Sequence, residues 1–232
     1  MILEMTRPVQ GGLRQERKLE VVANNLANAD TTGFKKDSVS FDNKFRAQVN
    51  KDFSQGTLQE TGNPLDFALS DKGFFKVDTA EGIRYTRDGN FFLDADGIVV
   101  DQNGNPVMGQ GGPIAINGAN ADLEQELSVN QNGEIRLGGT IIDTFDIVTF
   151  SDLGKMKRDG QNLLSYEGNT TDEIPVDKPI VQQGSLEKSN IRVVEEMVRM
   201  IDDHRMFETF TKSMMTFDEI DGRAINDVGK LR

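Results

Sequence analysis

Apolar residues follow a helical period at both ends of the chain and a strand-like pattern between them. Over residues 2–26 they are separated by three, four or sums of these numbers, which is the spacing of one helical face. Pro8, Gly11 and Gly12 weaken the first half of this helix, so we expect it to need a packing partner in order to form. Gly33, which tolerates positive φ, is expected to end the segment.

The middle of the chain, over about residues 34–165, has short apolar runs punctuated by Asp-Gly and Asn-Gly pairs. These pairs accept the positive φ angles of tight hairpin turns, so the pattern predicts an all-β domain. Alternation in residues 144–150 is partial, which leaves open which face of that strand is buried. The expected strands cover residues 74–77, 83–86, 90–93, 98–100, 106–108, 127–129, 134–137 and 144–150.

A second helical stripe begins near residue 186 and continues to the end of the chain. Ser189 or Asn190 is suited to cap it, and Glu195 and Glu196 complement the dipole of its first turns. Some 35 to 40 residues would extend roughly 55 Å at about 1.5 Å per residue, which exceeds the needs of a small domain core. The cover is either the first helix, from the same or a neighbouring chain, or the β domain of a monomer. The position of both helices at the chain ends favours assembly.

These patterns predict an α+β fold in three segments: an N-terminal helical segment 1–33, a central β domain 34–185 and a C-terminal helix 186–232 that pairs with the N-terminal segment in coiled-coil-like packing. The candidate subunit-packing residues are the apolar positions of the two helices. They are Ile2, Met5, Val9, Leu19, Val22, Leu26, Val193, Met197, Met200, Ile201, Phe207, Phe210, Met214 and Phe217.

Composition narrows the possible functions. The net charge of −12 over 232 residues disfavours nonspecific binding to nucleic acid or anionic lipid. The absence of cysteine excludes disulfides, thiolate metal sites and cysteine nucleophiles. No apolar run approaches the roughly 20 residues of a membrane span, and the first residues lack the pattern of a cleaved signal. We therefore expect no membrane insertion, and either cytosolic residence or export without a cleaved signal peptide.

Candidate catalytic chemistry is weak. Residues 94–97 and 101–104 resemble parts of a calcium loop, but Ile98 stands where an oxygen donor is required, so hairpin turns explain them better. His204 is the sole histidine, which makes catalytic triads and histidine metal sites improbable. We therefore expect no enzyme activity, no catalytic or metal-binding residues and no cofactor.

Several motifs are shared with a known family. Residues 22–36 resemble the N-terminal signature of the flagellar axial proteins, the rod, hook and hook-associated group. Residues 56–69, 73–77 and 85–91 resemble the opening of that family's β domain, and residues 183–190 and 196–208 resemble its C-terminal helix. His204-Arg205 departs from the usual Gln-Arg there. The motif residues are Asn24, Asn25, Leu26, Ala27, Asn28, Thr32, Gly33 and Phe34.

This resemblance implies a structural subunit of the bacterial flagellar basal-body rod that polymerises through its terminal helices into a torque-transmitting tube. It implies a rod in the periplasmic space, with the chain itself, other rod proteins and the flagellar export apparatus as partners. Two alternatives remain open from the residues alone. One is a carbohydrate- or protein-binding β module that does not polymerise, and the other is an enzyme acting on peptidoglycan.

Overall fold

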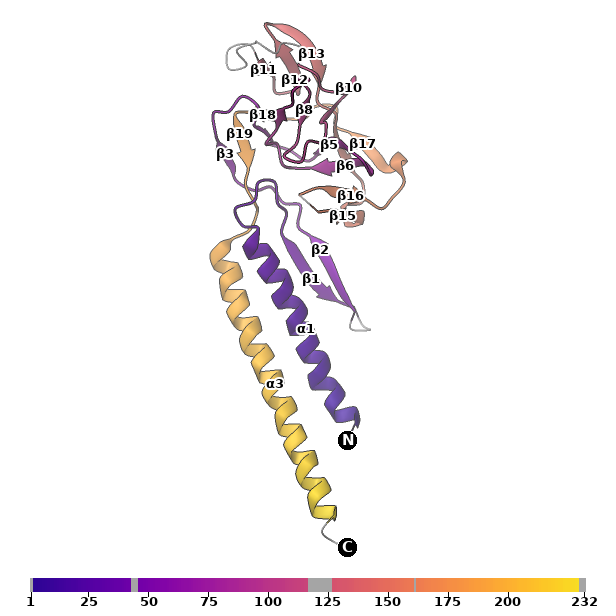
Figure 1. Cartoon of the computed structure of the whole chain (residues 1–232), viewed down its shortest axis with the longest axis vertical. Helices are drawn as coiled ribbons and strands as arrows, with labels where there is room; N and C mark the ends of the chain where they lie inside the picture. Colours follow the sequence, from indigo (N-terminus) through magenta and orange to yellow (C-terminus); the bar gives the residue numbers. More distant parts are fainter. Residues whose placement is uncertain (1, 43–45, 117–126, 161, 230–232) are drawn as a thin grey trace. The chain divides into compact units, whose positions relative to one another are not determined.

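The computed structural model describes residues 2–42, 46–116, 127–160 and 162–229 (Figure 1). The chain forms two compact units. The helical unit holds both terminal segments together with Lys36–Asp52, and the β unit comprises Asp30–Lys35 and Phe53–Asn190. The predicted α+β class, with helices at the ends and a central β region, is confirmed. The division differs from the predicted one because Lys36–Asp52 belongs with the helices.

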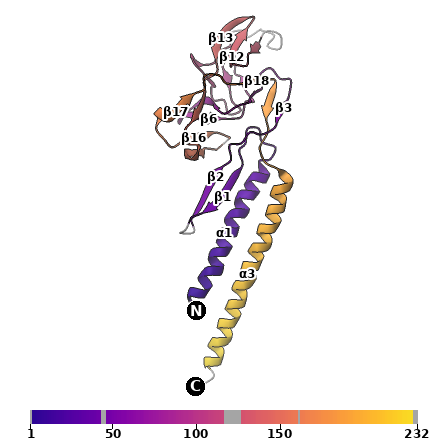
Figure 2. The same cartoon turned by 180° about the vertical axis from the view of Figure 1, so that it is seen from behind.

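In the helical unit, α1 (Ile2–Ala27) and α3 (Val193–Gly229) lie side by side and run in opposite directions (Figures 1 and 2). The hairpin of β1 (Asp37–Phe41) and β2 (Ala47–Lys51) belongs to the same unit, and β1 packs on α1. The α1 helix continues through Pro8, so packing on α3 outweighs the local cost of that proline. The partner that the weak first helix was expected to need is therefore provided by α3 of the same chain.

The β unit is built on a six-stranded antiparallel sheet with the order β15-β16-β6-β5-β14-β17. Among the described residues of this unit, five shorter sheets are also present. The strands of the main sheet are β15 (Met156–Arg158), β16 (Leu164–Tyr166), β6 (Gly82–Thr86), β5 (Phe74–Thr79), β14 (Ile147–Phe150) and β17 (Glu173–Pro175).

The shorter sheets pair strands that are distant as well as adjacent in sequence. The last two strands of the unit return to its first two, so that β18 (Val181–Gln183) pairs with β4 (Phe67–Leu69) and β19 (Ser185–Glu187) with β3 (Leu58–Glu60). The other elements are β7 (Phe92–Leu93), β8 (Val99–Val100), β9 (Met108–Gly109), β10 (Gly112–Pro113), β11 (Leu127–Val129), β12 (Glu134–Leu137), β13 (Thr140–Thr144) and the 3-10 turns η1 (Leu153–Lys155) and η2 (Thr170–Asp172).

The central strands β5 and β14 of the main sheet are buried on both faces. On β5, Phe75 enters a cluster with Phe67, Phe91 and Phe145, whereas its neighbour Phe74 enters a second cluster on the opposite face. The Phe75 ring lies edge-on to Phe91 at 5.3 Å and to Phe145 at 5.4 Å, a favourable aromatic arrangement. Burial on both sides explains the imperfect alternation in residues 144–150, because β14 sends Ile147 to one cluster and Val148 to the other.

Most of the expected strands are present, with shifted ends. The expected strands at residues 127–129 and 134–137 coincide with β11 and β12. The single strand expected over residues 144–150 is wrong in one respect, because a break at residues 145–146 separates β13 from β14. Several other strands were not predicted, since they are short or polar runs. They are the β1–β2 hairpin, β3, β4, β10, β13 and β15 to β19.

Candidate assembly surface

The two helices approach each other closely at the glycines of α1. A Cβ atom at Gly11 would overlap the ring of Phe210, whereas one at Gly12 would lie 3.7 Å from the Met214 Cε atom. Gly11, one of the residues that weaken α1 as an isolated helix, is therefore what lets the Phe210 ring pack against the α1 backbone. Phe207, Phe210, Met214 and Phe217 are half-buried, as is Met200.

The predicted packing residues divide into two groups. Val22 is buried and Leu19 and Leu26 are half-buried within the helical unit, together with the α3 residues just named. Val9, Val193, Met197 and Ile201 are exposed. Ile2 and Met5 lie on α1, but their side chains are outside the described part of the structure.

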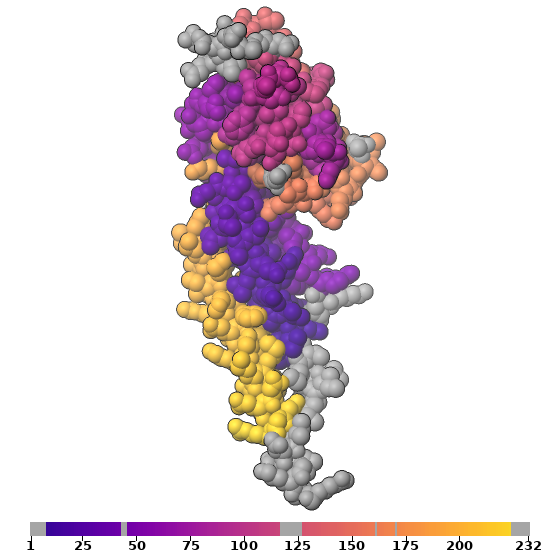
Figure 3. Space-filling view, in the orientation of Figure 1, coloured from indigo at the N-terminus to yellow at the C-terminus, as the bar shows by residue number. Residues whose placement is uncertain are grey.

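Several apolar side chains remain exposed on the described parts of the helices. Two groups of them form the α1 patch and the α3 patch, and Met206, Met215 and Ile220 are also exposed farther along α3. The α1 patch consists of Val9 and Leu13, which are 41% and 59% exposed. The α3 patch occupies the first turns of α3, where Val194 is 74% exposed; its members are Val193, Val194, Met197, Val198 and Ile201. In the space-filling view, no other described part of the helical unit covers α3 (orange to yellow) on the side away from α1 (Figure 3). Leu13, Val194 and Val198 were not among the predicted contact residues. Helical periodicity would have identified them as outward-facing if Asn25 and Glu196 had been assigned to the sides of α1 and α3 that face each other.

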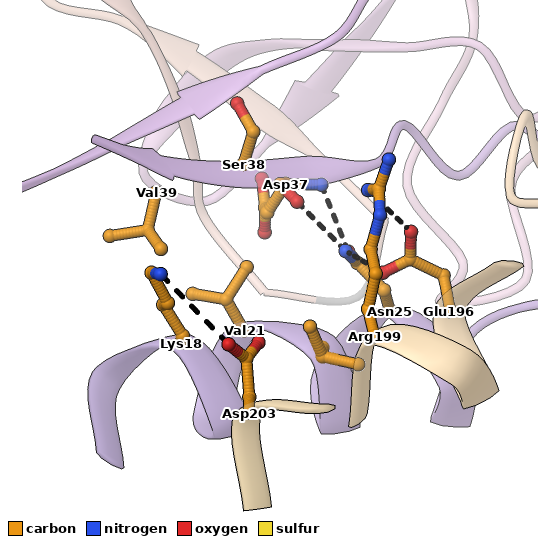
Figure 4. A pocket seen from close by; sticks show the side chains of 10 residues that line it. Lys18, Val21, Asn25, Asp37, Ser38, Val39, Glu196, Arg199 and Asp203 are labelled. Atoms are coloured by element: carbon orange, nitrogen blue, oxygen red, sulfur yellow. Dashed lines mark hydrogen bonds and ion pairs between the residues drawn. The ribbon is translucent and has the colours of Figure 1, made fainter. Parts of the chain in front are cut away.

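A pocket of about 290 Å³ lies between α1, β1 and α3 (Figure 4). Val21, Val22 and Val39 give it apolar walls, and Lys18 and Asp203 lie across it with 3.9 Å between the Lys18 Nζ atom and a carboxylate oxygen. Burial raises the pKa of the Asp203 carboxyl, and the Lys18 ammonium partly opposes that shift. The pocket thus brings opposite charges together in one small space.

Asn25, a residue of the shared motif, connects three elements of the helical unit. Its Nδ2 atom donates to the Asp37 carbonyl at 2.8 Å, and its Oδ1 atom accepts from the Asp37 backbone N–H at 2.9 Å. The same Nδ2 atom lies 3.4 Å from the Glu196 carboxylate, which also accepts from Lys36 and Arg199. The short amide of Asn25 thus pairs with a strand backbone and a helix carboxylate together, which uses both its donor and its acceptor atoms. Of its motif neighbours, Asn28 donates back to the Asn24 carbonyl at 2.8 Å.

The second half of the motif lies in the β unit. The Thr32 hydroxyl donates to the Asp88 carboxylate at 2.8 Å, and the Gly33 N–H donates to the Glu187 carbonyl at 2.7 Å. Gly33 has a φ of +66°, and a Cβ atom there would overlap the backbone of residues 87 and 88.

Phe34, the last residue of the motif, is buried under the guanidinium of Arg158, whose central carbon lies 4.1 Å from the ring centroid of Phe34. Burial raises the pKa of the Asp88 carboxyl, against the opposing hydrogen bonds from Thr32, Asn90 and Asn162.

A buried ion cluster, the Glu187 cluster, was not anticipated from the sequence. It consists of Glu187, Lys35 and Arg87, whose side chains are 0%, 3% and 6% exposed. The Glu187 carboxylate accepts from Lys35 at 2.6 Å, from Arg87 at 3.2 Å and from the backbone N–H of Gly56 at 2.8 Å. Burial lowers the pKa of the Arg87 guanidinium, whereas the Glu187 carboxylate favours its charged form. No local pattern in sequence reveals a contact between residues 152 positions apart.

The groups that suggested other chemistry have structural partners. The Asp94 carboxylate accepts from the backbone N–H groups of Asp96 and Ile98, and Asp101 accepts from those of Asn103 and Asn105, as turn residues do. His204 is exposed on α3, with its Nδ1 atom 3.5 Å from Glu208. Within the described residues, no three acidic, histidine or cysteine side chains gather as metal ligands would. Among the described helices, none is both long and apolar enough to span a bilayer.

Three family models match successive parts of the chain. Residues 11–35 match the flagella basal body rod protein model, residues 68–137 match the flagellar hook protein FlgE/F/G D1 domain, and residues 182–227 match the flagellar basal body rod FlgEFG protein C-terminal model. The first match contains the Asn25 and Gly33 positions, and the third contains Glu187 and the α3 patch.

Curated relatives match over nearly the whole length. The flagellar basal-body rod protein FlgF of Caulobacter vibrioides is 34% identical, with 93% of each chain covered. The rod protein FlgG of Bacillus subtilis is 29% identical over 97% of this chain and 99% of its own, and FlgF of Mesorhizobium japonicum is 29% identical over 92% of each.

In sequence, the compact middle of the chain and residues 224–230 resemble the rod protein FlgF most and FlgG next. Residue 230 lies outside the part of the chain that the structure describes. Relatives of both names are found, in agreement with that prediction. Given the three family matches and a relative above 30% identity over nearly all of both chains, this protein belongs to the flagellar basal-body rod protein family, in which FlgF and FlgG are its relatives.

Proposed function

We propose that this structural subunit of the flagellar basal-body rod assembles through the exposed apolar surfaces of its two terminal helices. The observation that carries the proposal is the α3 patch, five apolar side chains on consecutive turns of one helix, each 36% or more exposed. A soluble helix normally turns such residues inward, so a cluster of this kind on a subunit of a polymer indicates a contact surface.

The proposed contact set differs from the set of apolar positions on the helices. Phe210 and Met214 lie against the α1 glycines of the same chain, so they support the subunit's own helix pair, and Phe207 and Phe217 are half-buried. The α1 and α3 patches are then available to neighbouring subunits, as are Met206, Met215 and Ile220 farther along α3. We propose that the partners are copies of this chain and other rod proteins, and that the chain has no enzymatic activity.

We further propose, from family membership, that the chain reaches a rod in the periplasmic space through the flagellar export apparatus without a cleaved signal peptide. Export in an unfolded state would suit a chain whose helices are ordered by packing rather than by their own propensity. The weak helix-forming sequence of α1, with Pro8, Gly11 and Gly12, supports this part of the proposal.

The assembly proposal is tested by light scattering of the full chain over a concentration series, alone and with a second rod protein. We expect elongated oligomers from the wild-type chain and a monomer from Val198→Asp, because a charge at a desolvated contact is unfavourable. The matched control is Ile180→Asp in the β unit, where the native side chain is 46% exposed against 53% for Val198.

Circular dichroism should show the same helix content in all three proteins, since both substituted positions are exposed. Oligomers of equal size from Val198→Asp and the wild type would remove the α3 patch from the assembly surface. Loss of assembly in both variants would instead point to a general effect of added charge.

A further inference from the structure

The α1 and α3 patches lie at opposite ends of the helix pair. Gly11, between the two members of the α1 patch, is beside Phe210, far along α3. The α3 patch lies at the N-terminal end of α3, which begins at Val193. There Glu196 lies near Asn25, which is close to the C-terminal end of α1. Within one copy, therefore, the two patches are separated along the helix axis and cannot cover each other.

The patches also lie on opposite sides of the pair. At 3.6 residues per turn, Val9 and Leu13 fall on the side of α1 opposite Lys18, which faces α3. Val194, Val198 and Ile201 fall on the side of α3 opposite Glu196 and Asp203, which face α1. Each copy therefore presents the α1 patch on one side of the helix pair and the α3 patch on the other, at different levels along the helix axis.

We propose that the α1 patch of one copy docks on the α3 patch of a second copy, which is shifted along the helix axis. The proposal rests on the proposed function, since it specifies which surfaces of neighbouring subunits meet. If neighbouring copies point the same way, α1 of one runs antiparallel to α3 of the next, as it does to its own α3.

Sequence spacing gives the register of this contact. With Leu13 against Val198, Val9 falls against Ile201, and Arg17 comes level with Glu195 of the second copy. The apolar contacts are then flanked by opposite charges. Within one chain, α1 and α3 are antiparallel, with Gly11 opposite Phe210 and Lys18 opposite Asp203. Leu13, between Gly11 and Lys18, therefore lies at about the same position along the helix axis as Glu208. Moving from Glu208 to Val198 slides the second copy by about 15 Å at 1.5 Å per residue.

Such a contact joins two different patches, so it is heterologous. Each copy that docks leaves its other patch free, and addition continues into an open array instead of stopping at a closed dimer. Contact between two α3 patches would be isologous and would stop at two subunits. The experiment must therefore identify which patch meets which.

The chain contains no cysteine, so single introduced thiols report contacts without background. The test uses the full chain carrying Leu13→Cys, Val198→Cys or Glu208→Cys, at concentrations where light scattering shows association. Under mild oxidation a disulfide forms where the Cα atoms approach within about 7 Å. We expect a crosslinked dimer when Leu13→Cys and Val198→Cys are mixed, and none from either variant alone.

Crosslinking of Val198→Cys with itself would overturn the proposal in favour of an isologous contact. Crosslinking of Leu13→Cys with Glu208→Cys, and not with Val198→Cys, would overturn it in favour of neighbours without the shift. Either result leaves assembly through the helices intact. Wild-type chains that never associate, alone or with another rod protein, would instead remove the proposed function together with the inference.

Discussion

At the scale of single residues, the Glu187 carboxylate has the most demanding environment described in the β unit. It is the negative partner of two buried cations, Lys35 and Arg87, and it also accepts a backbone N–H from Gly56. Breaking a buried ion pair is costly because the remaining charge is left without compensation in a medium of low dielectric. Two such charges depend on Glu187.

We therefore predict that Glu187→Gln lowers the free energy of unfolding by about 3–5 kcal/mol, measured by urea denaturation of the full chain. The control is Glu167→Gln in the Lys157–Glu167 pair, where the side chains are 62% and 54% exposed. That exposed pair should contribute less than about 1 kcal/mol. Equal small effects from both substitutions would show that the Glu187 cluster is not rigidly buried in solution.

The contacts of individual buried polar residues were also the feature that could least be predicted from the sequence. The motif residues Asn25 and Gly33 were singled out through resemblance, but their partners Asp37, Glu196 and Glu187 could not be found from spacing. A buried polar contact between distant segments leaves no periodic pattern. Only the tertiary fold brings these groups together.

At the scale of elements, hydrophobic periodicity predicted both helices because apolar residues recur at helical spacing in each segment. The helix expected over residues 2–26 is observed as Ile2–Ala27. The helix expected from about residue 186 begins only at Val193, because Ser185–Glu187 forms β19 instead. Strands of two or three residues, such as β7 and β8, are set by cross-strand pairing more than by local pattern, so their ends could not be predicted. Periodicity also could not tell which apolar helix residues face the chain's own partner helix and which face outward.

The two glycines of α1 allow a matched test of helix packing. Gly12→Ala should raise the free energy of unfolding by about 0.5–1 kcal/mol, because alanine is the better helix former and its Cβ has room 3.7 Å from Met214. Gly11→Ala should lower it by about 1 kcal/mol or more, since the added methyl overlaps the Phe210 ring. Thermal unfolding of the two variants provides the comparison. A gain at both positions would mean that Phe210 moves aside without cost.

At the scale of the whole molecule, the chain is threaded so that neither unit is continuous in sequence. Lys36–Asp52 returns to the helical unit after Asp30–Lys35 has entered the β unit. A domain boundary chosen from composition, such as 34–185, therefore separates residues that depend on each other. It removes Leu186 and Glu187, which are buried members of β19.

This organisation predicts different behaviour for two fragments. A fragment of residues 30–190 retains the Glu187 cluster and should unfold cooperatively in urea as a monomer. A fragment of residues 30–185 keeps Lys35 and Arg87 but lacks their carboxylate, and loses the β19–β3 pairing. Its unfolding midpoint should be clearly lower, and amide hydrogen exchange should be faster around residues 54–60. Identical midpoints would show that the last strand adds nothing to the unit.

The span of the Glu187 cluster also bears on when the chain can fold. Lys35 and Glu187 are 152 residues apart, and β18 and β19 pair with β4 and β3 from the start of the same unit. Contacts of such long separation form slowly, because the whole intervening chain must close as a loop before they contribute. While residue 187 is still missing from a growing or emerging chain, the β unit lacks its closing strand. The full stability of the β unit is thereby tied to delivery of the C-terminal segment, so the unit is completed only when most of the polypeptide has arrived.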